Sequence, residues 1–340
     1  MSESIYLLAI ESSCDETSAA VLCNDRVLSN IIATQKVHEK YGGVVPELAS
    51  RAHQQHIVPV VQQALNEAEV TSSQLQAIAY TQGPGLMGAL LVGSSFAKSM
   101  SLALDIPAIP VHHMRAHIMA HFIRNTAEQE VPQFPFMCLT VSGGHTQLVL
   151  VHSPLEMQVV GETIDDAAGE ALDKAAKVMG LPYPGGPHVD RLSVEGDPHK
   201  YTFTTPRIDG FNYSFSGLKT SLLYFLREQN ERDKTFIERE LHSICASYQH
   251  VVTEYLLQKL ESAAMHYNIS QVALAGGVSA NSALRKKLNV LCEKNGWKAF
   301  IPPMSYCTDN AAMIGISGYH QFLAGHTGLL SDVPKASWPL

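Results

Sequence analysis

The sequence predicts an α/β fold with two lobes of the same design. Short apolar runs typical of buried strands alternate with helical patterns along most of the chain. A strand, a small polar turn and a second strand occur in this order twice, at 5–23 and at 136–151. Turns with glycine or hydroxyl side chains follow strands at 11–17, 142–146 and 276–281. We therefore expect a duplicated fold with a nucleotide cleft between its lobes.

The first lobe is expected to open with a β-meander. Apolar runs separated by polar turns predict three strands, at 5–10, 18–23 and 27–33. A loop should follow at 37–45, and then a helix at 46–69 that Pro59 should kink or split. The polar face of this helix is expected in solvent, with Arg51, His53 and His56. Strands at 75–81 and 108–111 should flank a helix that runs to about Leu104.

The second lobe is expected to contain strands and helices of the same kinds. Its strands are predicted at 136–141, 147–151, 272–275 and 297–301. Its helices are predicted at 165–179, 218–227, 236–267 and from Asn281 to about Cys292. Prolines and polar residues at 126–135 indicate a linker, and a final helix at 309–322 should close the first lobe. The predicted domains are therefore 1–128 with 302–340, and 129–301.

Composition and charge argue against several classes of protein. The chain has 340 residues, with 24 Lys and Arg against 32 Asp and Glu, so its net charge of −8 argues against a free-standing nucleic-acid binder. A local basic face, or a polyanion held jointly with a partner, is still compatible with that charge. Six cysteines without a C-x-x-C pair are typical of a reduced cytosolic protein. The N-terminus lacks a signal sequence, and the stretch at 86–106 contains Lys98 and several serines, so no membrane span is expected.

A histidine pair follows the strand at 108–111. His113 and His117 are four residues apart, so on a helix both imidazoles lie on one face and could share a cation. Asp309, at the start of the final helix, is the candidate for a third ligand. Taken alone, such a pair is more often two polar histidines on a solvated helix. A metalloprotease would need H-E-x-x-H, and here Met114 occupies the place of the glutamate base.

The turns at 142–146 and 276–281 have the composition of anion-binding loops. Glycine lets the backbone approach a ligand, and successive N–H groups with hydroxyls suit a phosphate, although a plain glycine hairpin has the same residues. Asp190 could bind the hydroxyls of a sugar, or could simply be a charge in the first turn of a helix. Asp15 and Glu16 could accept a proton, or could belong to an ordinary acidic hairpin.

Seven motifs in order make the sequence recognisable. They are AIESSCDETS at 9–18, GGVVPELASRAH at 42–53, QGPGL at 82–86, HHMRAH at 112–117, VSGGHT at 141–146, YPGGP at 183–187 and AGGVSAN at 275–281. The sequence resembles the TsaD family (also YgjD or Gcp), the tRNA N6-adenosine threonylcarbamoyltransferases. Each motif is weak alone, but the ordered set spans 8–318 and is specific. The resemblance implies an actin-like, Hsp70-like (ASKHA) two-lobed fold.

The same resemblance implies a reaction and its components. The donor would be threonylcarbamoyl-AMP, and the product t6A at position 37 of tRNAs that read ANN codons. One divalent metal ion per subunit, iron or alternatively zinc, would be bound by His113, His117 and Asp309. The positions that match substrate-binding residues are Thr140, Val141, Ser142, Gly143, Gly144, Asp173, Gly186, Asp190 and Asn281. A TsaB-like paralogue and a TsaE-like ATPase would be partners in the cytoplasm, without a membrane.

Two other functions compete with this interpretation. An ATPase or kinase of the same fold would turn over ATP without tRNA. A non-enzymatic scaffold resembling an inactive paralogue would be expected to lack the metal ligands, and all three are present in this chain.

Overall fold

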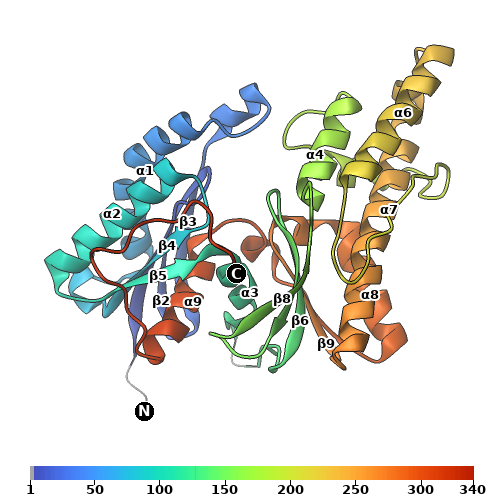
Figure 1. The fold of residues 1–340 in the computed structure, drawn as a ribbon. Helices are drawn as coiled ribbons and strands as arrows, with labels where there is room; N and C mark the ends of the chain where they lie inside the picture. Colours follow the sequence, from blue (N-terminus) through green and yellow to red (C-terminus); the bar gives the residue numbers. More distant parts are fainter. Residues whose placement is uncertain (1–3, 127) are drawn as a thin grey trace. The chain divides into compact units, whose positions relative to one another are not determined.

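The computed structural model describes residues 4–126 and 128–340, except for the side chains of Lys36 and Glu39. Residues 1–3, part of the stretch predicted to lack a signal sequence, and Ala127, inside the predicted linker, lie outside the described residues. The chain divides into two compact units (Figure 1). Unit 1 contains Met1–Pro132, His152–Met157 and Pro302–Leu340, and unit 2 contains Gln133–Val151 and Gln158–Ile301.

Unit 1 is built on a mixed five-stranded sheet with the order β3–β2–β1–β4–β5. The strands are β1 (Tyr6–Glu11), β2 (Glu16–Cys23), β3 (Arg26–Thr34), β4 (Ala77–Gly83) and β5 (Ala108–His112). β1 pairs antiparallel with β2 and parallel with β4, which is in turn parallel to β5. The carboxyl ends of β1, β4 and β5 therefore lie at one edge, where open α/β sheets bind ligands.

Side chains of β1 alternate between the two faces of this sheet. Leu8 and Ile10 belong to the buried cluster formed with α1 (Pro46–Ala68) and α2 (Met87–Leu104). Ala9 faces α9 (Ala311–Leu323), where a Cβ atom on Gly315 would lie 3.2 Å from the Cβ atom of Ala9. Glu11 has the same parity as Ala9, so its carboxylate lies on the face that α9 covers. The short helix α3 (His113–Met119) contacts α9 there.

Among the described residues, α2 is the helix that is long and apolar enough to cross a membrane by length and composition. Its buried side contacts α1 and β4. A Cβ atom on Gly88 would clash with Ser50 of α1, and one on Gly93 would clash with Ser12. These glycines permit the close packing that is expected of a core helix.

Unit 2 repeats the design of unit 1. Its sheet has the order β8–β7–β6–β9–β10, with β6 (Phe136–Val141), β7 (Thr146–Val151), β8 (Met157–Glu162), β9 (Gln271–Ala275) and β10 (Lys298–Phe300). β6 pairs antiparallel with β7 and parallel with β9, as β1 does with β2 and β4. The matching order and directions confirm the predicted duplication.

The helices of unit 2 enclose one large apolar core. They are α4 (Ala168–Val178), α5 (Gly185–Ser193), α6 (Ser216–Arg232), α7 (Phe236–His266) and α8 (Ser282–Asn295). Tyr213, Phe215 and Tyr248 are fully buried in this core. Short 3-10 helices occur at Lys36–Tyr41 (η1), Ser72–Gln74 (η2), Ala120–Phe122 (η3), Gly277–Ala280 (η4) and Met304–Tyr306 (η5).

The structure differs from the expected local structure in three places. The expected loop at 37–45 contains most of η1. Pro59 does not split the helix at 46–69, because α1 runs through it and buries Ile57 and Val60 on either side. β8 was not predicted, since its sequence is short and only partly buried.

Candidate active site

Both predicted histidine ligands lie on α3, and the residue before them caps this helix. His112 Nδ1 accepts a hydrogen bond from the Met114 N–H at 3.2 Å, and His112 Nε2 donates to the Trp338 carbonyl at 2.9 Å. Burial lowers the pKa of His112 to about 4, which keeps the imidazole neutral, as one acceptor and one donor nitrogen require. His113 and His117 follow one turn apart, with ring centroids separated by 4.7 Å.

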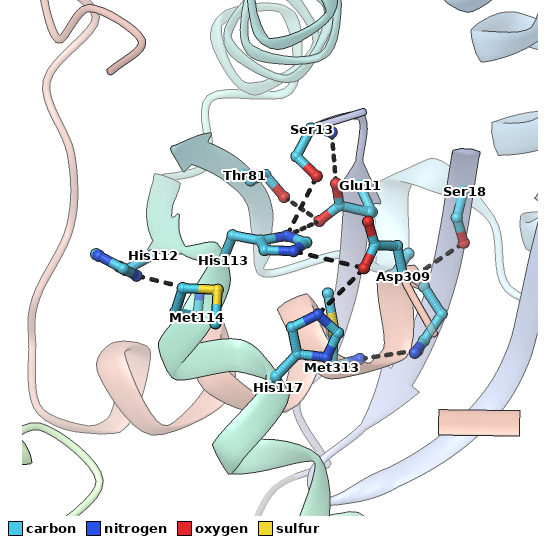
Figure 2. Close-up of polar contacts among 12 residues, drawn as sticks. Glu11, Ser13, Ser18, Thr81, His112, His113, Met114, His117, Asp309 and Met313 are labelled. Carbon is cyan, nitrogen blue, oxygen red and sulfur yellow. Dashed lines mark hydrogen bonds and ion pairs between the residues drawn. The ribbon is translucent and has the colours of Figure 1, made fainter. Parts of the chain in front are cut away.

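Asp309 reaches the histidines from near the other end of the chain. Its Oδ1 atom lies 3.1 Å from His117 Nε2 and 3.5 Å from His113 Nε2 (Figure 2). One potential ligand atom from each of the three residues lies within 4.8 Å of the others. The Ala311 N–H donates to Ser18 Oγ at 2.9 Å, which fixes the start of α9 against β2. The structure therefore brings the three predicted metal ligands together within unit 1.

The contacts within this cluster shift the pKa values of Asp309 and His113. Burial would raise the pKa of Asp309, but His113 and His117 hold it far below the ordinary value. Burial would lower the pKa of His113, but Asp309 and Glu11 raise it well above the ordinary value. A divalent cation would bind Asp309 and His113 through lone pairs that otherwise hold or attract a proton.

Glu11, at the end of β1, orients His113. Its fully buried carboxylate accepts hydrogen bonds from the Ser13 N–H at 2.5 Å and the Thr81 hydroxyl at 2.7 Å, and lies 3.1 Å from His113 Nδ1 (Figure 2). Burial would raise the pKa of Glu11, but His113 lowers it. An ionised Glu11 accepts the proton of Nδ1, so the proton that His113 would lose to a cation is the one on Nε2, toward Asp309.

The donor set fits a catalytic metal ion. Two imidazole nitrogens and one carboxylate oxygen suit zinc or ferrous iron, and three protein ligands leave coordination positions open for a substrate. His117 is 1% exposed, and its Nδ1 atom has no hydrogen-bond partner among the described residues. The nitrogen of this ring that faces Asp309, and that a shared cation would bind, is Nε2.

The turn between β1 and β2 places more carboxylates near Asp309. Burial raises the pKa of Glu16 to about 9, and the charges of Asp309 and Asp15 add to this effect. Glu16 therefore keeps its proton near neutral pH, so it can donate a proton but is a poor acceptor.

His53 does not lie in solvent as expected. It is fully buried, with Nδ1 2.7 Å from Thr17 Oγ1 and Nε2 3.0 Å from the Cys14 carbonyl oxygen. Because α1 packs against β2, position 53 faces the turn that precedes this strand. Arg51 is exposed as predicted, and pairs with Glu47 at 2.7 Å.

In unit 2, two predicted substrate-binding turns lie side by side. β6 and β9 are parallel, with Thr140 opposite Ala275, so the turns that follow them are neighbours. Gly276 has φ +85°, and a Cβ atom there would lie 2.5 Å from the Val141 carbonyl oxygen. Only glycine permits this approach. Gly143 and Gly144 are exposed, with open space where Cβ atoms would be.

Asp173 and Gly186, also predicted from the sequence, are in direct contact. Asp173 Oδ1 accepts hydrogen bonds from the N–H groups of Gly185 at 2.8 Å and Gly186 at 3.0 Å, and so caps the start of α5. Burial raises the pKa of Asp173, although both hydrogen bonds oppose the shift.

Asp190 and Asn281 form a second contact region. Asp190 Oδ1 accepts from the Ser282 hydroxyl at 2.8 Å, and Asp190 Oδ2 accepts from the Ser282 N–H at 3.1 Å. Asn281 Oδ1 accepts from the Leu284 N–H at 2.9 Å and caps α8. Asp190, in the second half of α5, is thereby joined to the start of α8.

Comparison with known proteins identifies the family. The family model described as "TsaD: tRNA N6-adenosine threonylcarbamoyltransferase" matches residues 26–316. The chain belongs to the TsaD family. A relative from Christiangramia forsetii is 58% identical over 321 residues, covering 94% of each chain. One from Porphyromonas gingivalis is 55% identical, covering 98% of each chain, and both are named tRNA N6-adenosine threonylcarbamoyltransferase.

As a member of the TsaD family, the chain is an enzyme, a transferase whose substrate is tRNA. Its activity is threonylcarbamoyl transfer to N6 of adenosine, which forms t6A. The family predicted from the seven motifs is confirmed, and it favours this activity over that of an ATPase, kinase, metalloprotease or scaffold.

Solved structures share the fold. HypF in its phosphate- and nucleotide-bound form matches with TM-score 0.61 and 13% identity, covering 94% of this chain and 46% of that chain. The activator of 2-hydroxyisocaproyl-CoA dehydratase from Clostridium difficile matches with TM-score 0.50 and 12% identity, covering 94% and 97%. The predicted ASKHA fold is confirmed, whereas the nucleotide cleft between lobes stays a prediction.

The sequence reasoning missed the residues that surround His113. Glu11, Ser13 and Thr81 were not assigned a role. One signal was available, because Glu11 directly follows the apolar run at 5–10, which the sequence predicts to be a buried strand. A buried acid in that position needs a partner.

Proposed function

We propose that this TsaD family enzyme transfers the threonylcarbamoyl group from threonylcarbamoyl-AMP to N6 of adenosine 37 in tRNAs that read ANN codons. Family membership supports the transfer to tRNA adenosine. The convergence of His113, His117 and Asp309 within 4.8 Å is the observation that carries the proposal for the site.

The proposed cofactor is one divalent ion per subunit, iron or alternatively zinc, bound by His113, His117 and Asp309. Bound there, it would supply Lewis-acid chemistry toward the oxygens of the donor. The protein's own part is to hold the ligands in place. Glu11 directs the His113 ring, and His112 fixes the start of α3.

The proposed adenylate site is the set of turns in unit 2. Its binding residues are Thr140, Val141, Ser142, Gly143, Gly144, Asp173, Gly186, Asp190 and Asn281. Gly143 and Gly144 are exposed, and their backbone N–H groups suit the phosphate and the charge that develops on it as AMP leaves, whereas the Ser142 N–H already donates to the His145 carbonyl. Asp190 suits the ribose hydroxyls, since its carboxylate accepts hydrogen bonds.

In the proposed step, the N6 amine attacks the carbamoyl carbon. A C–N bond forms, the C–O bond of the mixed anhydride breaks, and AMP leaves with that electron pair. The aromatic amine is a weak nucleophile, so alignment by the bound adenylate supplies much of the rate. Asp15 is the proposed acceptor of the amine proton, because Glu16 already holds a proton at its raised pKa.

The proposed partners are a TsaB-like paralogue and a TsaE-like ATPase, and the proposed location is the cytoplasm. The six cysteines, all within the described part of the chain, form no disulfide, as expected in a reducing compartment.

Replacing His113 with alanine tests the site. The full chain with its partners, tRNA and threonylcarbamoyl-AMP should form t6A, read by mass spectrometry of tRNA nucleosides. His113→Ala should lose bound metal and t6A formation while its circular dichroism is unchanged. His326→Ala removes an exposed histidine and should keep both.

A fully active His113→Ala variant would refute the metal's role in transfer. Turnover of ATP by the isolated chain without tRNA would favour an ATPase instead.

A further inference from the structure

Gln249 lies on α7, outside every sequence motif, yet its side chain contacts two proposed adenylate residues. It is 3% exposed. Its Nε2 atom donates to Asp190 Oδ1 at 3.0 Å, and its Oε1 atom accepts from Asn281 Nδ2 at 2.8 Å. Asp190 belongs to α5 and Asn281 to the turn before α8, so a single side chain bridges three elements.

The orientation of the Gln249 amide is fixed by its surroundings. The second hydrogen of Nε2 faces Ser193 Oγ at 2.7 Å, and that hydroxyl donates to the Asp190 carbonyl at 2.7 Å. Both N–H groups and the carbonyl oxygen are therefore in use. If the amide were flipped, its oxygen would face the Asp190 carboxylate. Repulsion between these two electronegative oxygens disfavours that orientation.

The bridge also fixes the atoms that remain for a ligand. Asn281 Oδ1 is committed to the cap of α8, so the only other polar atom of this side chain, Nδ2, is directed by Gln249. Asp190 is held between Ser282 on one side and Gln249 on the other. A buried amide is costly unless every group is paired, so packing alone does not explain glutamine here.

We propose that Gln249 is a positioning residue that sets the placement of Asp190 against Asn281, and thereby the affinity for the adenylate part of the donor. The inference rests on the proposed function, because it takes both residues as parts of the adenylate site. Gln249 acts through these residues and does not itself touch the substrate.

Titration of AMP onto the full chain tests the proposal. Gln249→Met keeps the length of the side chain and removes its hydrogen bonds. We expect AMP affinity to fall by roughly tenfold or more, the loss expected for a hydrogen bond to a charged group. The matched control is Gln258→Met, which changes an exposed glutamine on the same helix and should leave AMP affinity unchanged.

An exchange of groups separates positioning from stability. Gln249→Glu places a carboxylate against Asp190 and should weaken AMP binding at least as much as Gln249→Met. Adding Asp190→Asn returns an amide–carboxylate pair with the two groups exchanged. Asp190→Asn alone removes the carboxylate proposed to bind the ribose, so the coupling is measured by a double-mutant cycle. The double variant should bind AMP at least about threefold more tightly than the two single losses together predict. A residue that serves only packing would give no such recovery.

The outcomes separate this inference from the proposed function. If the wild-type chain does not bind AMP, the adenylate site itself is refuted and the role of Gln249 with it. If the wild-type chain binds AMP and Gln249→Met binds it equally well, positioning is refuted and the site stands. The proposal would also be overturned if Gln249→Met lost thermal stability together with AMP affinity and the double variant showed no recovery of AMP affinity.

Discussion

At the scale of single residues, Glu11 decides which nitrogen of His113 is available to a cation. Its carboxylate lies 3.1 Å from His113 Nδ1. Glu11→Gln replaces an anion with an amide that satisfies this nitrogen less well and polarises the ring less. We expect affinity for Zn²⁺ to fall by about 10- to 100-fold, the usual effect of losing a carboxylate that supports a histidine ligand. Competition with a fluorescent chelator measures it.

The control for this variant is Glu47→Gln, which changes an exposed acid on α1. It should leave Zn²⁺ affinity unchanged. An unchanged affinity in Glu11→Gln would mean that Ser13, whose hydroxyl lies 3.2 Å from His113 Nδ1, is sufficient to orient the ring.

Glu16 should make the stability of the metal-free protein depend on pH. Its pKa is raised from 4.5 to about 9 by burial and by nearby Asp309, so the folded state holds a proton that the unfolded state releases. This stabilisation is complete below pH 4.5 and is lost as pH rises toward 9, at up to about 1.4 kcal/mol per pH unit. Glu16→Gln lacks the dependence.

The measurement is denaturant unfolding of both metal-free proteins between about pH 6 and pH 8. As pH rises, the free energy of unfolding of Glu16→Gln should increase relative to that of the wild type by about 1 kcal/mol for each pH unit. A difference that is constant across this range would show that Glu16 is ionised in the folded state.

At the scale of elements, the C-terminal segment 333–340 ties β4 to α3. The Lys335 N–H donates to the Gln82 carbonyl at 2.8 Å, next to the end of β4. The Trp338 carbonyl accepts from His112 Nε2 at 2.9 Å, and the two rings lie 4.7 Å apart. The segment therefore supports the residue that caps the metal-binding helix.

Removing residues 334–340 should weaken both the fold and the metal site. Loss of these hydrogen bonds and of the ring contact should lower the free energy of unfolding by about 2–4 kcal/mol. Zn²⁺ affinity should also fall, because α3 loses the anchor of its cap. Trp338→Phe keeps the backbone carbonyl and an aromatic ring, and should change neither strongly. Reduced stability with full Zn²⁺ affinity would show that the segment does not act on α3.

Elements were predictable where periodicity is strong and contacts are local. The helix expected at 236–267 is α7, Phe236–His266, and the helix expected to end at about Leu104 does so. Contacts between distant segments were not predictable in the same way. Gln249 on α7 meets Asp190 on α5, and nothing in the pattern of either helix indicates which faces meet.

At the scale of the whole molecule, duplication was visible in the sequence because both copies keep the strand–turn–strand pattern. The division at 128 and 302 stays a proposal for functional domains. Unit 1 also includes His152–Met157, which is the connection after β7 and the first residue of β8. Within this unit the Arg115 guanidinium donates to the Leu155 carbonyl at 2.9 Å, a contact with no local sequence signal.

The net charge of the whole chain sets how it should bind tRNA. At −8, the isolated protein repels a polyanion at long range, so only a few local cations can contact phosphates. We expect weak binding to tRNA that weakens further as salt rises, with a log–log slope corresponding to only about two or three phosphates. Filter binding between about 50 and 200 mM salt measures this slope. If a partner supplies the missing positive charge, adding the TsaB-like and TsaE-like proteins should tighten binding and steepen the slope. Tight, salt-insensitive binding by the chain alone would mean that stacking or shape, not shared charge, holds the tRNA.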